Sequence, residues 1–197
     1  NNRVFLFLSL IMSLFLWCQF ALMTYLLLFL RDALHDSLYL SGIGLSVFLI
    51  GGVIGRLFWG WISDVFFSHA RELVIIMNAL IGLASLVVLI VLGLNGAVVP
   101  VFVIFLTLFI SGINTAGWNG VMITILVSEV DNDKAGLASG MSYAIGSLGT
   151  MVGVPITGLI IEHSSYFIAL GFLSILFFLA AFFVHFVMQM KQKLATR

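Results

Sequence analysis

The sequence predicts an all-helical polytopic membrane protein, a bundle of six transmembrane helices, and three observations lead to this fold class. Of the 197 residues, 62% are hydrophobic and 8% are charged, whereas a soluble domain carries about 25% charged residues. The charges gather in short clusters, and each interval between them is long enough for the roughly 20 residues of a membrane-crossing helix. The strict alternation of a transmembrane barrel is absent, and lipid leaves no backbone group unsatisfied, so the intervals are expected to be helices.

The expected spans follow one another along residues 1–197 as a single six-helix domain. Their apolar runs cover residues 4–30, 38–62, 73–94, 97–128, 135–161 and 166–188. The first run is longer than the apolar core of a signal peptide and is followed by no small-residue cleavage pattern, so it is interpreted as a true span. Short turns at 93–96 and 162–165 predict that the helices they join are antiparallel neighbours.

The basic residues predict that both ends of the chain lie in the cytoplasm. If the start of the chain is cytoplasmic, Arg31 is the only basic flanking residue that falls outside. The basic flanking residues expected inside are Arg3, Arg71, Lys134, Lys191, Lys193 and Arg197. This asymmetry follows the positive-inside rule. The first predicted partner is the lipid bilayer, which is expected to be a plasma (bacterial inner) membrane. A net charge of zero gives no electrostatic reason for a nucleic-acid partner.

Arg56 is the one charge deep within an expected span. A charge at the centre of a transmembrane helix costs about 2.5 to 3.5 kcal/mol and usually serves a function. Two interpretations stay open: a snorkelling anchor accompanied by Trp59 and Trp61 at the interface, or an ion-pairing gate residue near the cytoplasmic face. Gly51 and Gly55 form a small-xxx-small pair, which predicts that another helix approaches closely here.

The segment Gly55-Arg56-x-x-x-Gly60-x-x-Ser63-Asp64, followed by Arg71, resembles a signature of the major facilitator superfamily of secondary transporters. In that family the signature closes the second helix of each six-helix half. In that family one of the two copies of the signature is more complete, and there the aspartate is followed by a glycine and several basic residues. After Asp64 the glycine and most of the basic residues are missing, which is typical of the copy in the C-terminal half. The resemblance therefore implies helices seven to twelve of a twelve-helix transporter, with an N-terminal half as partner. It further implies a conformational gate formed in part by Gly55, Arg56, Gly60, Asp64 and Arg71.

The fifth span is rich in residues that weaken helices in water. Its second half contains Gly149, Gly153, Pro155 and Gly158. Such residues are tolerated in a membrane bundle, where neighbouring helices pack on small faces and satisfy the backbone. The pattern is similar to the fifth helix of each facilitator half. It is interpreted either as close helix packing or as a hinge at which the halves rock.

The resemblance implies that the first and fourth spans line a central cavity. Uncharged amides near the midplane can hydrogen-bond a polar solute, and indole rings can stack on a ring or sugar face. The candidate solute contacts are Trp17, Gln19, Asn114, Trp118 and Asn119. Tyr143, Ser147 and Thr150 of the fifth span are secondary candidates. Hydrogen bonding between helices is the alternative role for all of these side chains.

The expected function is secondary active transport of a small polar or organic solute by alternating access, as a symporter or antiporter. No Asp, Glu, Lys or His lies near the midplane of a span, so ion coupling would use the other half. A six-helix half alone would leave its cavity face open and is not expected to transport. A membrane channel, a non-transporting receptor and an intramembrane enzyme are the alternatives.

Other chemistry finds no support in the sequence. There is no repeated pore motif, no phosphate-binding loop and no pattern of a nucleophile with its base, so an enzyme is not expected. Histidines lack metal-ligand spacing, and neither a metal nor a cofactor is predicted. Cys18 is interpreted as a packing residue within an apolar run, and Glu129 and Glu162 as solvated carboxylates at span ends.

Overall fold

A computed structural model describes residues 2–33, 37–95 and 99–195 of the chain. These residues form six long helices: α1 (Asn2–Ala33), α2 (Leu38–Phe66), α3 (Arg71–Asn95), α4 (Val101–Ser128), α5 (Ala135–His163) and α6 (Tyr166–Ala195). A short 3-10 helix, η2 (Asn132–Lys134), precedes α5, and the described residues contain no strand. All six helices are long and apolar enough to cross a membrane. The predicted all-helical membrane fold is therefore confirmed.

The helix ends lie where local chemistry allows them. The Ser37 hydroxyl accepts the backbone N–H of Leu40 at 3.2 Å and caps the start of α2. Pro100 precedes the first residue of α4, since its ring is compatible with a helix start but not with a helix interior. The turn expected at 93–96 begins later than predicted, because α3 continues through Gly93 and ends at Asn95. Gly93 packs against Phe167. Residues 96–98, like Arg197, lie outside the described residues.

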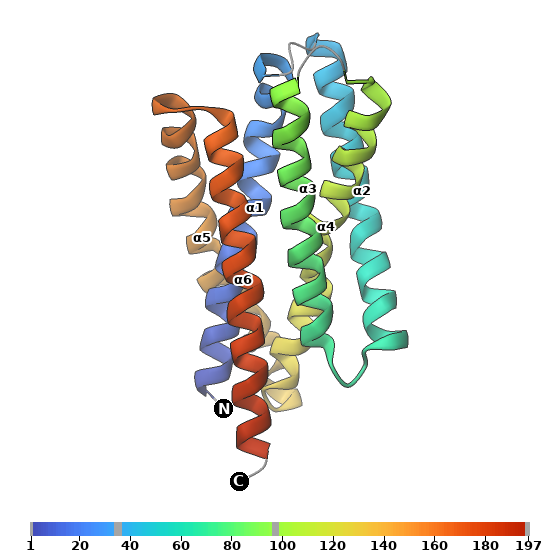
Figure 1. The fold of residues 1–197 in the computed structure, drawn as a ribbon. Coiled ribbons are helices and arrows are strands. Elements are labelled where there is room, and N and C mark those ends of the chain that lie inside the picture. Colours follow the sequence, from blue (N-terminus) through green and yellow to red (C-terminus); the bar gives the residue numbers. More distant parts are fainter. Residues whose placement is uncertain (1, 34–36, 96–98, 196–197) are drawn as a thin grey trace.

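The helices run alternately up and down, and both chain ends lie at the same end of the bundle (Figure 1). We call this the terminal end. In that view α3 and α6 lie in front, with α1 and α4 behind them. The largest contacts join α2 to α4, α5 to α1 and α6 to α3. Although α5 and α6 are antiparallel and joined by a short turn, α5 packs mainly on α1.

Glycines allow α2 and α4 to pack backbone against backbone. A Cβ atom added to Gly55 would overlap the carbonyl oxygen of Ile113, and one added to Gly112 would overlap that of Phe48. Gly51 is closed in the same way by the backbone of Phe109. Without a strong hydrophobic drive in lipid, helix pairs are held by such close van der Waals contact. The close approach expected at Gly51 and Gly55 is therefore made by α4.

Glycines also allow α5 to pack closely against α1. A Cβ atom on Gly149 would overlap the Ser13 carbonyl oxygen, and one on Gly153 would overlap the Trp17 ring. Gly158 faces the Tyr25 hydroxyl, which donates a hydrogen bond to the Val154 carbonyl oxygen at 3.2 Å. These glycines lie at a close helix contact. A hinge at Pro155 stays a prediction.

Candidate functional site

Helix α5 presents two different exposed faces. It is the least covered helix, with 22% of its membrane window buried against 61% for α1. One face is a stripe of large apolar side chains, Leu137, Met141, Leu148, Val152 and Leu159. The other is a stripe of small and polar residues, Gly136, Gly140, Tyr143 and Ser147. Both follow helical spacing. Since hydrocarbon favours the first stripe and a protein or water-filled surface the second, we call the second one the inner stripe.

Helix α2 is divided less cleanly, because the row of residues that contains Arg56 and Gly60 also contains the exposed Leu49 and Val53. Ile50, Ile54, Leu57, Phe58 and Trp61 form its apolar exposed face. On another side lie Gly42, Arg56 and Gly60, and a Cβ atom on either glycine would meet nothing within 4 Å. Arg56 is exposed and makes no hydrogen bond or ion pair to a described residue. Because no atom lies within 4 Å of a Cβ added at Gly60, this glycine has no packing role among the described residues, unlike Gly55.

Three uncharged side chains meet beside the inner stripe, and we call them the polar cluster: Gln19, Asn119 and Tyr143. The Asn119 amide donates to Gln19 Oε1 at 3.0 Å, and it also donates to the Ala116 carbonyl oxygen at 3.2 Å. The Tyr143 hydroxyl donates to Asn119 Oδ1 at 3.4 Å, a long hydrogen bond. Gln19 is 5% exposed, whereas Tyr143 is 44% exposed. The cluster thus leads from buried amides to an open face.

Two of the expected solute contacts lie in the core of the bundle. Trp118 has no exposed surface; its indole N–H donates to the Thr115 carbonyl oxygen at 2.8 Å. Its ring stacks on Phe15 with the centroids 5.0 Å apart. Asn114 is 2% exposed and donates to the Ile110 carbonyl oxygen, one turn earlier in its own helix. Both side chains serve packing between helices in this structure.

Trp17 is also engaged within the chain. Its indole N–H donates to Thr157 Oγ1 at 3.0 Å, and its ring lies against Phe172 of α6. Of the five residues expected to contact solute, the structure thus brings only Gln19 and Asn119 together. Tyr143, a secondary candidate, completes their cluster.

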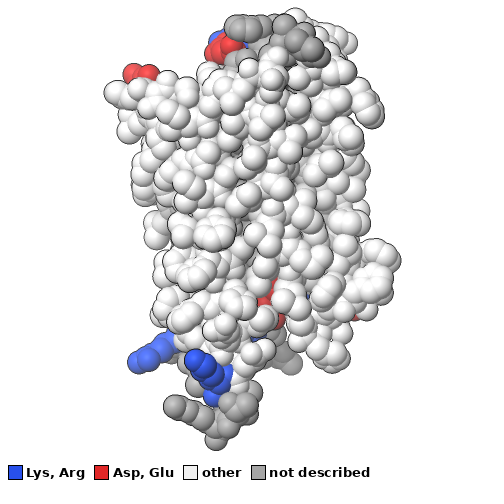
Figure 2. Space-filling view, viewed as in Figure 1, with Lys and Arg blue, Asp and Glu red and all other residues white. Residues whose placement is uncertain are grey.

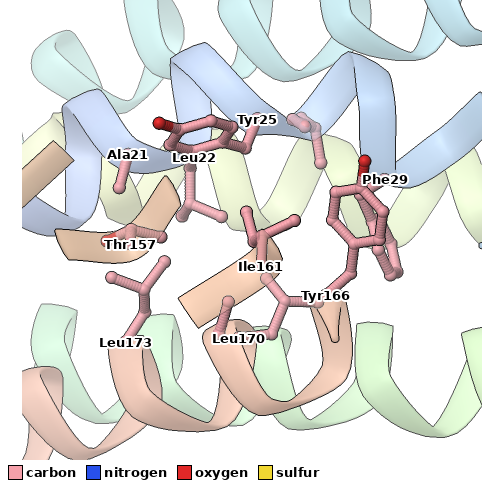
Figure 3. A pocket seen from close by; sticks show the side chains of 11 residues that line it. Ala21, Leu22, Tyr25, Phe29, Thr157, Ile161, Tyr166, Leu170 and Leu173 are labelled. Carbon is pink, nitrogen blue, oxygen red and sulfur yellow. The ribbon is translucent and has the colours of Figure 1, made fainter. Parts of the chain in front are cut away.

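A hollow between α1, α5 and α6 is too small to be a solute site. Figure 3 shows its lining, with Tyr25 from α1, Thr157 from α5 and Leu173 from α6. Its volume is about 20 Å³. That volume is close to the space of a single water, whereas ligand pockets typically measure about 300 to 1,000 Å³.

Two of the expected gate residues pair across the turn between α2 and α3. Arg71 Nη2 lies 3.1 Å from Asp64 Oδ1. The Asp64 side chain is 71% exposed and that of Arg71 is 29% exposed. Asp64 is therefore available to other partners on its open side, while Arg71 stays partly covered.

A second group of charges ties three helices together at the terminal end, and sequence reasoning missed it. Lys191 Nζ of α6 lies 2.6 Å from Glu72 Oε1 of α3 and 2.6 Å from Glu129 Oε1 at the end of α4. The side chains of Glu72 and Glu129 are only 11% and 13% exposed. The expectation that Glu129 is solvated is therefore wrong, because Lys191 covers its carboxylate. The three residues all flank spans on one predicted side, which was the available signal. Figure 2 shows the charged side chains of one face gathered toward its two ends.

Comparisons with known proteins establish the family and the fold. The family model of the Major Facilitator Superfamily matches residues 2–195. The fold is similar to the POT family transporter PepTSo, with a TM-score of 0.80, 20% identity, and coverage of 96% of this chain and 38% of that one. It is also similar to an auto-inhibited POT family peptide transporter, with a TM-score of 0.79, 20% identity, and coverage of 95% and 37%. No curated protein matches the chain. The six-helix chain therefore belongs to the major facilitator superfamily.

Proposed function

We propose that this chain is the C-terminal half of a secondary transporter that moves a small polar or organic solute by alternating access. The polar cluster of Gln19, Asn119 and Tyr143 carries the proposal, because it lies on an inner face that the described residues leave open. The chain spans 38% of the length of the PepTSo chain, which supports a larger protein with an N-terminal six-helix half as partner. That half would face the inner stripe of α5 across a solute cavity.

We further propose that the terminal end faces the cytoplasm of a plasma (bacterial inner) membrane. Arg3, Lys134 and Lys191 flank helices at this end, whereas Arg31 lies at the opposite end. Basic residues are enriched in cytoplasmic loops, so this orientation has the stronger charge asymmetry in its favour.

The chemistry of the polar cluster suits an uncharged part of a solute. Asn119 and Gln19 both carry amides, which donate and accept hydrogen bonds. The hydrogen bond from Tyr143 to Asn119 is long, at 3.4 Å, so a solute can replace it at small cost. The cluster contains no carboxylate, ammonium or imidazole group. Coupling to a proton or another ion is therefore assigned to the other half.

The gate is proposed to act at the terminal end. The exposed carboxylate of Asp64 can exchange Arg71 for the N-terminus of a helix in the other half, a contact worth about 0.3 to 1 kcal/mol. Arg56 has no partner among the described residues and is proposed to pair with an acidic or carbonyl group of the other half. Both contacts would form in one transport state and break in the other.

Uptake by the full-length protein in proteoliposomes, with and without a pH gradient, tests this function. We expect Asn119→Leu to lower solute uptake about tenfold, because one lost hydrogen bond is worth about 1 to 1.5 kcal/mol. In the same assay, Asp64→Asn is expected to lower uptake, because the proposed gate loses the carboxylate charge that would contact the other half. Expression of both variants should equal that of the unmodified protein.

Thr124→Val is the matched control on α4, because the Thr124 hydroxyl bonds only to the Gly120 carbonyl oxygen of its own helix. It is expected to leave uptake unchanged. Normal uptake by Asn119→Leu would remove the polar cluster from the solute path, and normal uptake by Asp64→Asn would remove the gate. Flux that does not saturate would favour a channel instead.

A further inference from the structure

An apolar groove follows the contact of α1 with α5, and Phe183 of α6 lies beside its inner part. It consists of two hollows, of about 300 Å³ and about 470 Å³. Leu6 and Met141 line the hollow nearer the terminal end, and Leu10 and Ile145, one turn further along the same helices, line the other. The two hollows thus follow one another along the same two helices, and together we call them the trough. Its main lining residues are Leu6, Leu10, Trp17, Met141, Leu148 and Phe183.

The trough opens toward lipid rather than toward the other half. On α5 it is lined by Leu137, Met141 and Leu148 of the apolar stripe, and by no residue of the inner stripe. On α6, the neighbouring exposed side chains are apolar as well: Ile168, Ile175, Phe178, Phe182 and Phe186. A surface of this composition is compatible with hydrocarbon. The front face of the molecule, with α6 in view, is correspondingly free of charge over most of its height (Figure 2).

The length of the trough matches one leaflet of a bilayer. From Lys134 at its mouth to Gly149 at its inner end, 15 residues of α5 rise by about 22 Å. Half of a hydrocarbon core is about 15 Å thick, and the polar interface adds several more. An acyl chain that starts at the interface beside Lys134 would therefore end near the midplane, where the trough ends.

The polar groups along the trough are already bonded within the chain. The Ser13 hydroxyl donates to the Ile145 carbonyl oxygen at 3.1 Å, and the Trp17 indole donates to Thr157. At the mouth, Lys134 is 58% exposed and pairs only with Asp131, at 2.8 Å. An ammonium has three donors, so Lys134 keeps donor capacity toward the trough. The walls thus fit an apolar chain, and the Lys134 ammonium offers a phosphate one contact at the mouth, beside the carboxylates of Asp131 and Asp133.

We propose that the trough binds one acyl chain of an anionic phospholipid, with its phosphate beside Lys134. The lipid comes from the leaflet at the terminal end. The bound chain lies along the contact of α1 with α5, on the side opposite the inner stripe. This site does not depend on the proposed transport function.

Native mass spectrometry of the full-length protein tests the head-group contact, with phosphatidylglycerol and phosphatidylcholine of identical acyl chains as probes. The unmodified protein is expected to retain phosphatidylglycerol in preference. Lys134→Gln should lower that preference about fivefold, which is the effect of one basic residue near an anionic surface. Lys193→Gln removes a charge at the same end and should leave the preference unchanged. Equal retention of the two lipids, or equal effects of the two variants, overturns the proposal.

Blocking the trough tests the acyl-chain contact separately. Leu148→Trp is expected to narrow the larger hollow and to lower retention of both lipids at least fivefold. Val152→Trp adds the same ring one turn further along the apolar stripe, outside the trough lining, and should retain both lipids. Equal retention by Leu148→Trp and Val152→Trp contradicts an acyl chain in the trough.

Discussion

Gly55→Ala is expected to destabilise the protein by about 3 kcal/mol, measured as the free energy of unfolding in detergent micelles. The new Cβ atom would overlap the Ile113 carbonyl oxygen and come within 2.7 Å of its Cα atom. Both groups belong to the backbone of α4, so no side chain can rotate away. The helices cannot separate locally either, because Gly51 and Gly112 hold the same pair of backbones in contact on the preceding turns.

Gly60→Ala is the matched control, five residues further along the same helix. A Cβ atom at Gly60 meets nothing within 4 Å, so no overlap arises. Alanine is also the better helix former, by about 1 kcal/mol. We expect equal or greater stability for this variant. Equal losses for Gly55→Ala and Gly60→Ala would contradict the close contact between α2 and α4.

Lys191→Met is expected to destabilise the protein by about 2 to 3 kcal/mol. The substitution would leave two poorly exposed carboxylates, Glu72 and Glu129, facing each other without a cation. Breaking a fully buried ion pair typically costs about 3 to 5 kcal/mol. The smaller figure applies because the Lys191 side chain is 31% exposed, and solvent screens the remaining charges. Denaturant titration in micelles measures the change.

Two further variants separate charge from packing at this site. Combining Lys191→Met with Glu72→Gln and Glu129→Gln removes the unpaired charges, so most of the lost stability should return. Lys134→Met breaks an exposed pair with Asp131 and should change stability by less than about 1 kcal/mol. A stable single variant, or a triple variant as unstable as the single one, would show that the three charges do not hold α3, α4 and α6 together.

The fold could be predicted because lipid imposes strong rules on composition and length. Apolar runs bounded by charges, or by the short turn expected between the third and fourth runs, located all the membrane-length helices that the structure describes. The exact ends were less predictable, because they depend on distant contacts. Gly93 suggests a turn by its type, yet Phe167 of α6 packs against it and α3 continues. Nothing in the residues next to Gly93 predicts its contact with Phe167.

The site could be predicted only in part. Amides in a span indicated Gln19 and Asn119, but nothing distinguished them from Asn114, which faces the core. In a soluble helix the apolar face marks the core, whereas in a membrane helix the core and the lipid are both apolar. The pairing of Lys191 with Glu72 joins residues 119 positions apart, so it required the tertiary structure.

Labelling of an introduced thiol tests alternating access around the inner stripe most directly. Ser147 is exposed on that stripe, one turn beyond Tyr143, and Cys18 is the only cysteine of the chain and is buried. We would combine Ser147→Cys with Cys18→Ala in the full-length protein, freed of other cysteines, in sealed vesicles. Alternating access predicts that a membrane-impermeant thiol reagent labels the new thiol from either side of the membrane. Labelling from one side only would contradict the account.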